Sequence, residues 1–157
     1  ATSTKQFSLK RHCMKTSSRN SFHGKVTAIR AGVINDEIEL LLDNGDTVCA
    51  LITRAATEKL KLTVGSEAVA IIKATEIMLA SETEDYVFSC RNQFSGKVVK
   101  LVRGFVNGEV LLQTASGLEI NATITLEGVN RLKLERGTPV VALFKTSNVL
   151  IAVKKPQ

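Results

Sequence analysis

The sequence is an internal duplication, and this feature constrains the fold more than any other. The stretch Ser-Ser-Arg-Asn-Ser-Phe-His-Gly-Lys-Val, which begins at Ser17, returns from Ser89 as Ser-Cys-Arg-Asn-Gln-Phe-Ser-Gly-Lys-Val. Arg91 follows Arg19 by 72 positions, and this offset holds without a gap through the rest of the chain. About 23 of roughly 64 aligned positions are identical, and many others exchange one aliphatic residue for another. The 157 residues are therefore two tandem copies of one small module.

The pattern within each copy predicts a β-rich module with one short helical turn. The Asn-Gly pair at 44–45 is a strong hairpin signal between two strand-like runs, and Ser-Gly at 116–117 is a weaker signal at the matching place. Thr53 and Thr125 are the expected N-caps of two short helical stretches. The expected strands are 25–29, 37–42, 47–52, 67–73 and 77–80 in the first copy, with 97–101, 139–145 and 149–153 among their counterparts, and the expected helical stretches are 54–60 and 126–132.

Five strands and one helical turn in about 65 residues match the element list of an OB-like small barrel. The expected fold class is all-β with one short helix per repeat, arranged as two tandem OB-like five-stranded barrel modules. Residues 82–86 carry three acids and little apolar content, which is typical of a linker. The expected organisation is a basic N-terminal segment or connector at 1–15, a first module at 16–81, an acidic linker at 82–87, a second module at 88–153 and a tail at 154–157.

Composition narrows the class of protein. The three cysteines show no paired spacing and no CxxC motif, which argues against a disulfide framework or a zinc site and favours a reducing, cytoplasmic setting. No apolar run approaches the ~20 residues that span a bilayer, and the polar N-terminus lacks the apolar core of a signal peptide. The net charge of +6 lies mainly at the two ends and in the second copy, not in one stripe. We expect no membrane partner, and modules this small favour a homo-oligomer.

The polar residues that recur in both copies indicate what the modules bind. Both charged types in the set are cations, and with hydroxyls and the backbone N–H groups of the helical turn they suit a compact oxyanion. No carboxylate in the set can act as a general base, and no Cys or His recurs as a nucleophile, so we expect no enzyme. Arginines in surface salt bridges and solvated lysines are the alternative. The set is Ser17, Arg19, Asn20, Thr53 and Lys73, matched by Ser89, Arg91, Asn92, Thr125 and Lys145.

Three further pairs of residues carry structural predictions. Asn20 and Asn92 are expected to form turns, because Asn side chains satisfy neighbouring backbone groups. The two glycines at 24 and 96 are expected to mark a bulge or a close backbone approach. Phe22 and Phe94 are expected to pack the barrels.

The opening motif resembles the SARNxxxG signature of the molybdenum-pterin-binding protein (Mop) family. The stretches Val-Ala-Ile-Ile-Lys-Ala-Thr-Glu-Ile at 69–77 and Val-Ala-Leu-Phe-Lys-Thr-Ser-Asn-Val at 141–149 resemble its closing K-A-S-x-V strand pair. The resemblance covers nearly all of 14–153 and implies a tandem di-Mop arrangement. This arrangement occurs in stand-alone cytoplasmic molybdate-binding proteins and in the C-terminal sensor of the ModE transcription regulator. It implies OB-type barrels that bind molybdate or tungstate at module interfaces, within a dimer or a larger ring such as a trimer of tandem modules.

The resemblance also implies a set of ligands, carried over position by position. Two departures from the family pattern stand out: Ser18 and Cys90 replace a small Ala, and a residue without a hydroxyl follows each helix start where the family often has Ser or Thr. The metal is expected only as its oxyanion, so no metal-ligating side chains are implied. The implied ligands are Ser17, Arg19, Thr53, the backbone near Ala56 and Lys73, and in the second copy Ser89, Arg91, Thr125, the backbone near Gly128 and Lys145.

The chemistry of molybdate fits this set of donors, and three functions stay open. Molybdate is fully deprotonated near neutral pH, so a cage of donors alone excludes hydrogen phosphate, whose proton would lack an acceptor. The first function is a stand-alone molybdate-binding or storage protein. The second is the sensor half of a ModE-type regulator, which would contact DNA only through a domain absent from this chain, with 1–15 as a connector. The third is a nucleic-acid-binding OB module, which the scarcity of recurring aromatic residues disfavours.

Overall fold

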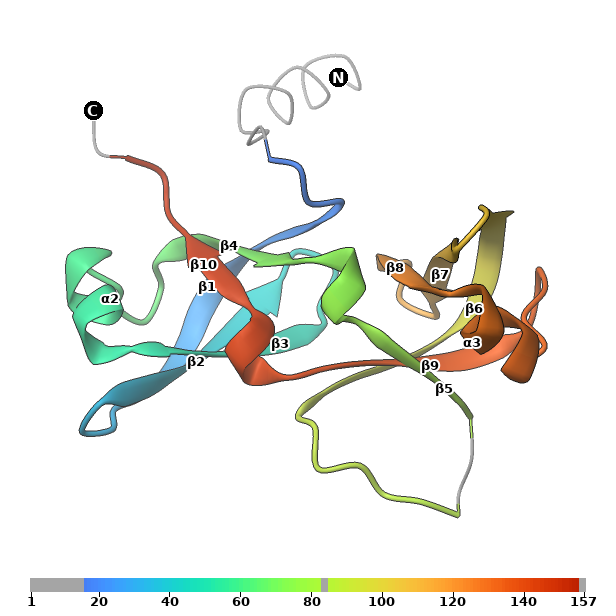
Figure 1. The fold of residues 1–157 in the computed structure, drawn as a ribbon. Helices are drawn as coiled ribbons and strands as arrows, with labels where there is room; N and C mark the ends of the chain where they lie inside the picture. Colours follow the sequence, from blue (N-terminus) through green and yellow to red (C-terminus); the bar gives the residue numbers. More distant parts are fainter. Residues whose placement is uncertain (1–15, 83–84, 156–157) are drawn as a thin grey trace.

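The computed structural model describes residues 16–82 and 85–155, and this part of the chain is mostly β, which confirms the predicted fold class (Figure 1). The basic segment 1–15 lies outside the described residues. The first repeat forms β1 (Asn20–Arg30), β2 (Asn35–Leu42), β3 (Thr47–Thr53), α2 (Arg54–Lys59), β4 (Glu67–Ile72), the 3-10 turn η1 (Ala74–Glu76) and β5 (Met78–Ser81). The second repeat forms β6 (Asn92–Arg103), β7 (Asn107–Thr114), β8 (Glu119–Thr125), α3 (Leu126–Arg131), β9 (Pro139–Phe144), the 3-10 turn η2 (Thr146–Asn148) and β10 (Leu150–Ala152).

The opening motif of each repeat belongs to its first strand, which is longer than predicted. In β1, Asn20 lies opposite Ile72 of β4, while Arg30 at the far end lies opposite Glu37 of β2. A β-bulge between Val26 and Ala28 shifts the register where the partner changes. A bulge of this kind bends a strand, so a single strand can serve both halves of a small barrel.

Each five-stranded antiparallel sheet contains one strand of the other repeat. The strand order is β10-β4-β1-β2-β3 in the first sheet and β5-β9-β6-β7-β8 in the second (Figure 1). Ile151 of β10 lies opposite Ala70 of β4, and Leu79 of β5 lies opposite Ala142 of β9. The structure differs here from the expectation that each barrel uses only its own strands. The short strands β5 and β10 have matching apolar patterns and follow matching 3-10 turns, so the sequence pattern fits either sheet equally well.

The buried apolar side chains of both barrels form one continuous cluster. Ile38 and Leu40 of β2 and Leu112 of β7 are fully buried in it. The ring of Phe94 stacks on that of Phe144 with centroids 5.6 Å apart, and Phe22 packs against the cluster from the first repeat. The prediction that Phe22 and Phe94 pack the barrels is confirmed. The exchanged strands and the shared core make the two modules one packed unit.

Gly24 and Gly96 stand where two backbones approach too closely for a side chain. A Cβ at Gly24 would lie 2.5 Å from the carbonyl oxygen of Leu41, and one at Gly96 would lie 2.6 Å from that of Gln113. The predicted close approach is confirmed. The hairpin turns also form as predicted, with φ of 97° at Gly45 and 91° at Gly117, a region that favours glycine.

Replacing Gly24 with alanine is expected to destabilise the protein by about 1–3 kcal/mol, because the strand pair β1–β2 must separate to admit the methyl group. Urea denaturation followed by circular dichroism measures the loss. Ser21→Ala, at an exposed position of the same strand, is the matched control and is expected to stay within about 0.5 kcal/mol of the wild type. Equal midpoints for Gly24→Ala and the wild type would contradict the close approach.

Candidate functional site

The two threonines predicted as N-caps do cap the short helices. Thr53 Oγ1 accepts a hydrogen bond of 3.1 Å from the backbone N–H of Ala56, and Thr125 Oγ1 accepts one of 3.1 Å from Gly128. The cap explains why threonine precedes each helix, since its oxygen satisfies a donor that the first turn leaves unpaired. The N–H groups of Ala56 and Gly128 are therefore engaged inside the turn, while each threonine hydroxyl keeps its own hydrogen to donate.

The recurring lysines lie at matching bends between the last two strands of each repeat. Lys73 follows β4 and precedes η1, and Lys145 follows β9 and precedes η2. Both have extended backbone conformations and are exposed. The chain crosses from one module to the other directly after each lysine, so both cations lie beside the boundary between the modules.

Most of the residues implied for the second repeat line one cavity. Its volume is about 670 Å³, and its wall includes Ser89, Thr125, Gly128 and Lys145. Another part of the wall comes from the first repeat, through η1 and β5, so the cavity lies where the exchanged strand enters the second sheet. Much of the remaining wall is apolar and comes from side chains such as Leu79, Leu132 and Phe144, and cavities of this size and lining are typical of ligand sites.

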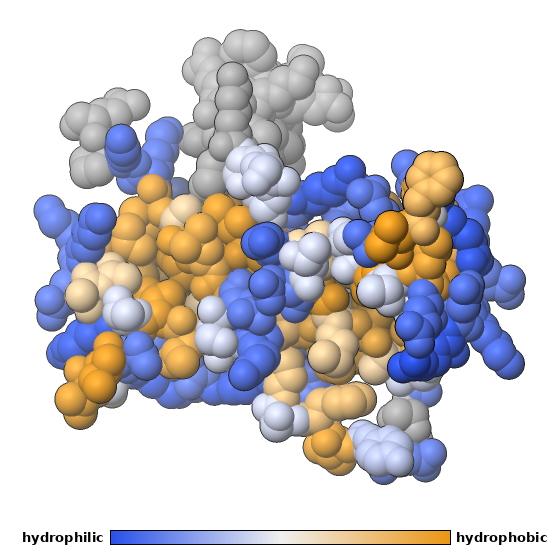
Figure 2. Space-filling view, viewed as in Figure 1, coloured by the Kyte–Doolittle hydropathy of each residue, from blue (hydrophilic) through white to orange (hydrophobic). Residues whose placement is uncertain are grey.

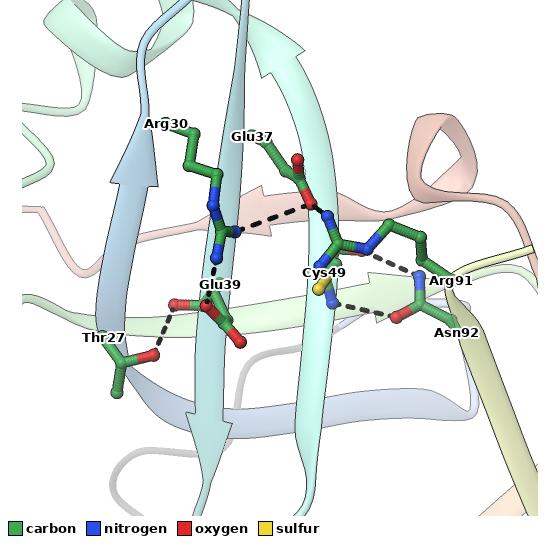
Figure 3. Close-up of polar contacts among 7 residues, drawn as sticks. All are labelled: Thr27, Arg30, Glu37, Glu39, Cys49, Arg91 and Asn92. Atoms are coloured by element: carbon green, nitrogen blue, oxygen red, sulfur yellow. Dashed lines mark hydrogen bonds and ion pairs between the residues drawn. The ribbon is translucent and has the colours of Figure 1, made fainter.

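The arginine of each opening motif does not line that cavity but reaches the opposite repeat. Arg19 Nη1 lies 2.9 Å from Glu109 Oε2 on β7. Arg91 Nη1 contacts Glu37 Oε1 on β2, and Arg30 lies on the other side of the same carboxylate at 3.8 Å (Figure 3). The alternative that these arginines form salt bridges therefore holds in this structure, and the salt bridges cross between the modules.

The second residue of each motif anchors it to the end of a neighbouring strand. Ser18 Oγ donates to the backbone oxygen of Ile72 at 2.8 Å, and Cys90 Sγ donates to that of Phe144 at 2.8 Å. These are the two positions where the family has a small Ala. Both side chains are half-buried, whereas Ser17 and Ser89 before them are exposed. The two substitutions thus add a hydrogen bond that fixes the motif beside the lysine that follows each strand.

Two buried asparagines, which we name the amide clasps, join the modules. Asn92 Nδ2 donates to the backbone oxygen of Cys49 at 2.8 Å, and its Oδ1 accepts from the Cys49 N–H at 2.9 Å (Figure 3). Asn20 makes the same pair of bonds with Asn121, at 2.7 and 2.8 Å. Asn20 and Asn92 are 0 % and 2 % exposed. The prediction that they form turns is wrong, because each amide pairs instead with the third strand of the other repeat.

Asp36 fixes the turn between β1 and β2 beside the start of α2, a feature that the second repeat lacks, since Gly108 occupies the matching position. Its Oδ1 accepts the Gly32 N–H at 3.0 Å and lies 3.8 Å from Arg54 Nη1. A hydrogen bond from Thr57 lowers the pKa of Asp36 most, and the Gly32 N–H and Arg54 add to this effect against the opposing influence of burial.

Because the folded-state pKa of Asp36 lies below the value of about 3.9 expected in the unfolded chain, its ionisation stabilises the fold above that pH. This contribution is expected to fall away as the pH drops from about 4 through the folded pKa. Thermal unfolding of the wild type and Asp36→Asn at pH 7 and pH 3 tests it. The difference in Tm between the two proteins should shrink at pH 3, and a constant difference would contradict the assignment.

The described residues contain no group of three or more His, Cys, Asp or Glu side chains that could hold a metal ion. Burial raises the pKa of the Cys49 thiol, with Glu39 adding to the effect, which favours its protonated form. In the described part of the chain, no helix is long and apolar enough to cross a membrane. The polar groups on the cavity wall include the hydroxyls of Ser89 and Thr125, the amine of Lys145 and the carboxylate of Glu76.

Comparisons with known proteins agree with the duplication. The model of the TOBE domain matches twice, at residues 16–79 and 89–151. The chain is 38 % identical over 140 residues to the molybdenum transport protein ModE of Azotobacter vinelandii, covering 89 % of this chain and 52 % of that protein. It is 36 % identical over 140 residues to the molybdenum-pterin-binding protein MopA of Rhodobacter capsulatus, covering 89 % and 53 %. The chain thus spans about half the length of these relatives.

A solved structure matches over the whole of its own length. It is a crystal structure of the cytoplasmic molybdate-binding protein ModG with molybdate bound, 38 % identical in sequence. The match has a TM-score of 0.86 and covers 90 % of this chain and 100 % of that chain. The structural similarity extends across both modules. It therefore includes the way in which the two repeats are paired, as well as the fold of each repeat.

Proposed function

The chain belongs to the TOBE domain family, and from this premise we propose that it is a cytoplasmic molybdate-binding protein. The observation that carries the proposal is the cavity in which Ser89, Thr125 and Lys145 meet. These residues offer two hydroxyl donors and one cation on a wall at the boundary between the modules. The structural likeness to a molybdate-bound protein that also has two modules supports the same ligand.

The donors proposed for the site favour an anion that can only accept hydrogen bonds. Lys145 carries three donors and no acceptor, and each hydroxyl can turn its hydrogen towards an oxyanion. Hydrogen phosphate retains a proton that such a site leaves unpaired, which costs binding free energy. Sulfate can also only accept hydrogen bonds, but it is smaller than molybdate, so the size of the site must discriminate against it. Tungstate matches molybdate in charge and nearly in size, so we include it among the ligands and propose a binding protein, not an enzyme.

The proposed sites include the matching residues of the first repeat, Ser17, Arg19, Thr53 and Lys73 with the backbone near Ala56. The same caps and bends recur there, because the two repeats fold alike. Arg19 and Arg91 are the members of the two sets that a glutamate engages in this structure. We propose that they turn to the oxyanion when it binds.

We further propose that copies of the chain associate through the exposed apolar turns of the two modules. The β1–β2 turn exposes Val33 (94 %) and Ile34 (74 %), and the matching β6–β7 turn exposes Phe105 (104 %) and Val106 (73 %). Figure 2 shows hydrophobic surface at the lower left, where Figure 1 draws the β1–β2 turn. Backbone hydrogen bonds tie each turn to the start of the neighbouring helix, through Arg54 and Leu126. An interface there adjoins the capping threonines, so a homo-oligomer, a dimer or a trimer, would enclose the proposed sites.

Two biological settings fit this binding function. A stand-alone store is favoured by the match to the ModG structure, since the match covers 100 % of that chain. The sensor part of a longer regulator is favoured by the ModE relative, of which the chain covers 52 %. In the second setting, DNA is contacted by a domain outside this sequence.

Isothermal titration with molybdate tests the proposed function, with sulfate and phosphate as controls and the oligomeric state measured by light scattering. The expected result is selective binding of molybdate, at one or more ions per chain, by an oligomer. A parallel titration with tungstate is expected to give a similar affinity. Absence of heat with molybdate, for protein that circular dichroism shows to be folded, would overturn the proposal.

A further inference from the structure

The recurring glutamates are the feature of the site that oxyanion binding alone does not explain. Glu37 and Glu109 are the only acids that stand at matching positions of the two repeats. A carboxylate repels an anionic ligand. The presence of one glutamate beside each of the two proposed ligand arginines therefore needs a physical explanation. Each pairs with the arginine of the opposite repeat, and both pairs cross the boundary between the modules.

The proposed ligand set of the second repeat is divided in this structure. Ser89 lines the large cavity with Thr125 and Lys145, whereas Arg91, two residues further along, contacts Glu37 on β2 of the first repeat. In the other pair, Arg19 and Glu109 line a separate cavity of about 110 Å³. The Glu37 carboxylate thus holds the Arg91 guanidinium outside the cavity that Ser89, Thr125 and Lys145 line, and Glu109 pairs with Arg19 in the same way.

We propose that Glu37 and Glu109 are affinity-determining residues that act as internal competitors of the oxyanion, each occupying the arginine that the ligand must recruit. The inference rests on the proposed function and concerns the same sites. An incoming dianion must replace the carboxylate as the partner of the guanidinium. A weak oxyanion ligand fails to do so, and a ligand that also gains the lysine and the hydroxyls succeeds.

The exposure of these pairs makes the exchange feasible. The side chains of Arg19 and Glu109 are 60 % and 48 % exposed, and those of Arg91 and Glu37 are 48 % and 23 % exposed. Ion pairs so open to water hold together weakly, because solvent screens the attraction. Asn20 and Asn92, each next to the arginine in sequence, fix the backbone across the boundary, so the guanidinium can turn without separating the modules.

The two competitors differ in strength. When Arg91 leaves Glu37, Arg30 still lies 3.8 Å from that carboxylate and compensates its charge. Glu109 has no second ion-pair partner among residues 16–82 and 85–155, and Val102 stands where the first repeat has Arg30. Lys100 lines the same small cavity without an ion pair to Glu109, so release of Arg19 leaves that carboxylate without a direct ion-pair partner, and Glu109 is the stronger competitor.

Titration of Glu37→Gln and Glu109→Gln with molybdate, beside the wild type, tests the inference. Glutamine retains the shape and a hydrogen-bond acceptor but removes the charge, so each variant should bind molybdate about two- to fivefold more tightly, with the larger gain for Glu109→Gln. Glu39→Gln is the matched control. Glu39 lies two residues from Glu37 on the same face of β2 and pairs with Arg30, so its loss should leave the affinity within about twofold of the wild type.

Three outcomes separate the inference from the function on which it rests. If the wild type binds molybdate and both glutamine variants bind it equally or more weakly, the competitor role is overturned and the binding function stands. Weaker binding by Glu37→Ala and Glu109→Ala, restored by glutamine, overturns it in favour of a positioning role. No binding by the wild type or any variant overturns the function and the competitor role together. Faster rotation of the Arg19 and Arg91 guanidinium groups in the ligand-free variants, measured by NMR, is the expected sign that the competitor has been removed.

Discussion

Replacing Asn92 with alanine is expected to lower the free energy of unfolding by about 2–5 kcal/mol, because it leaves two buried backbone groups unpaired. The amide of Asn92 satisfies both the N–H and the C=O of Cys49, at 2.9 and 2.8 Å. With the side chain 2 % exposed, water cannot take its place without opening the boundary between the modules. Denaturation in urea, followed by far-UV circular dichroism, measures the loss. Asn20→Ala is expected to cost about as much, since Asn20 makes the same bonds with Asn121.

The matched control for Asn92→Ala is Ser95→Ala on the same strand. Ser95 is exposed, so its replacement should change the free energy of unfolding by less than about 0.5 kcal/mol. A midpoint for Asn92→Ala that coincides with that of Ser95→Ala would show that the clasp does not hold the modules together. Circular dichroism before denaturation establishes that both variants begin from the same content of strand.

Replacing Lys145 with alanine is expected to weaken molybdate binding by about 2–5 kcal/mol, provided that the bound ion is shielded from water. Among the described residues, Lys145 is the only cation on the wall of the large cavity, so its loss leaves Arg91, which the ligand must draw away from Glu37, as the one proposed source of compensating charge. Isothermal titration of the folded variant measures the loss. Binding at the matching site of the first repeat would remain, and it would appear in the titration curve as a separate phase with the wild-type affinity.

The control for Lys145→Ala is Lys97→Ala, which removes the same charge from an exposed position of β6 outside that cavity. Its affinity should fall by less than about threefold, because a distant surface charge is screened by salt. Equal losses for the two variants would mean that Lys145 acts only through the net charge of the protein. Wild-type affinity in Lys145→Ala would remove that residue from the site.

The features that the sequence predicted correctly depend on neighbours along the chain. The capping bonds of Thr53 and Thr125 span three residues, and the glycine turns follow from local φ values. The features that it missed depend on which segments meet. Asn20 follows Arg19 in a stretch that the sequence predicts to be a turn, yet its partner is Asn121, 101 positions further on. No local pattern indicates that pairing, because the side chain needs only a backbone N–H and C=O, which every strand offers.

The candidate site could be predicted only in part for the same reason. The identities of Lys145, Thr125 and Ser89 follow from the resemblance, and the structure brings them to one cavity. The partner of Arg91 could not be foreseen, since Glu37 is 54 positions away in the sequence and no local pattern joins the two residues. The sequence did contain one indication of this pairing, because an arginine and a glutamate both stand at matching positions of the two repeats. Opposite charges that recur in this way often pair across the boundary between pseudo-symmetric units.

The exchange of β5 and β10 makes the covalent link between the repeats a part of the folding mechanism. A single repeat carries five strands, but its last strand completes the sheet of its neighbour, so one copy alone leaves the edge of β4 or β9 open. Two separate copies would have to find each other before either sheet could close, and their stability would depend on protein concentration. Fusion into one chain replaces that encounter with an intramolecular step at an effective concentration of roughly millimolar. The unit that evolution duplicated is therefore smaller than the unit that can fold at low concentration.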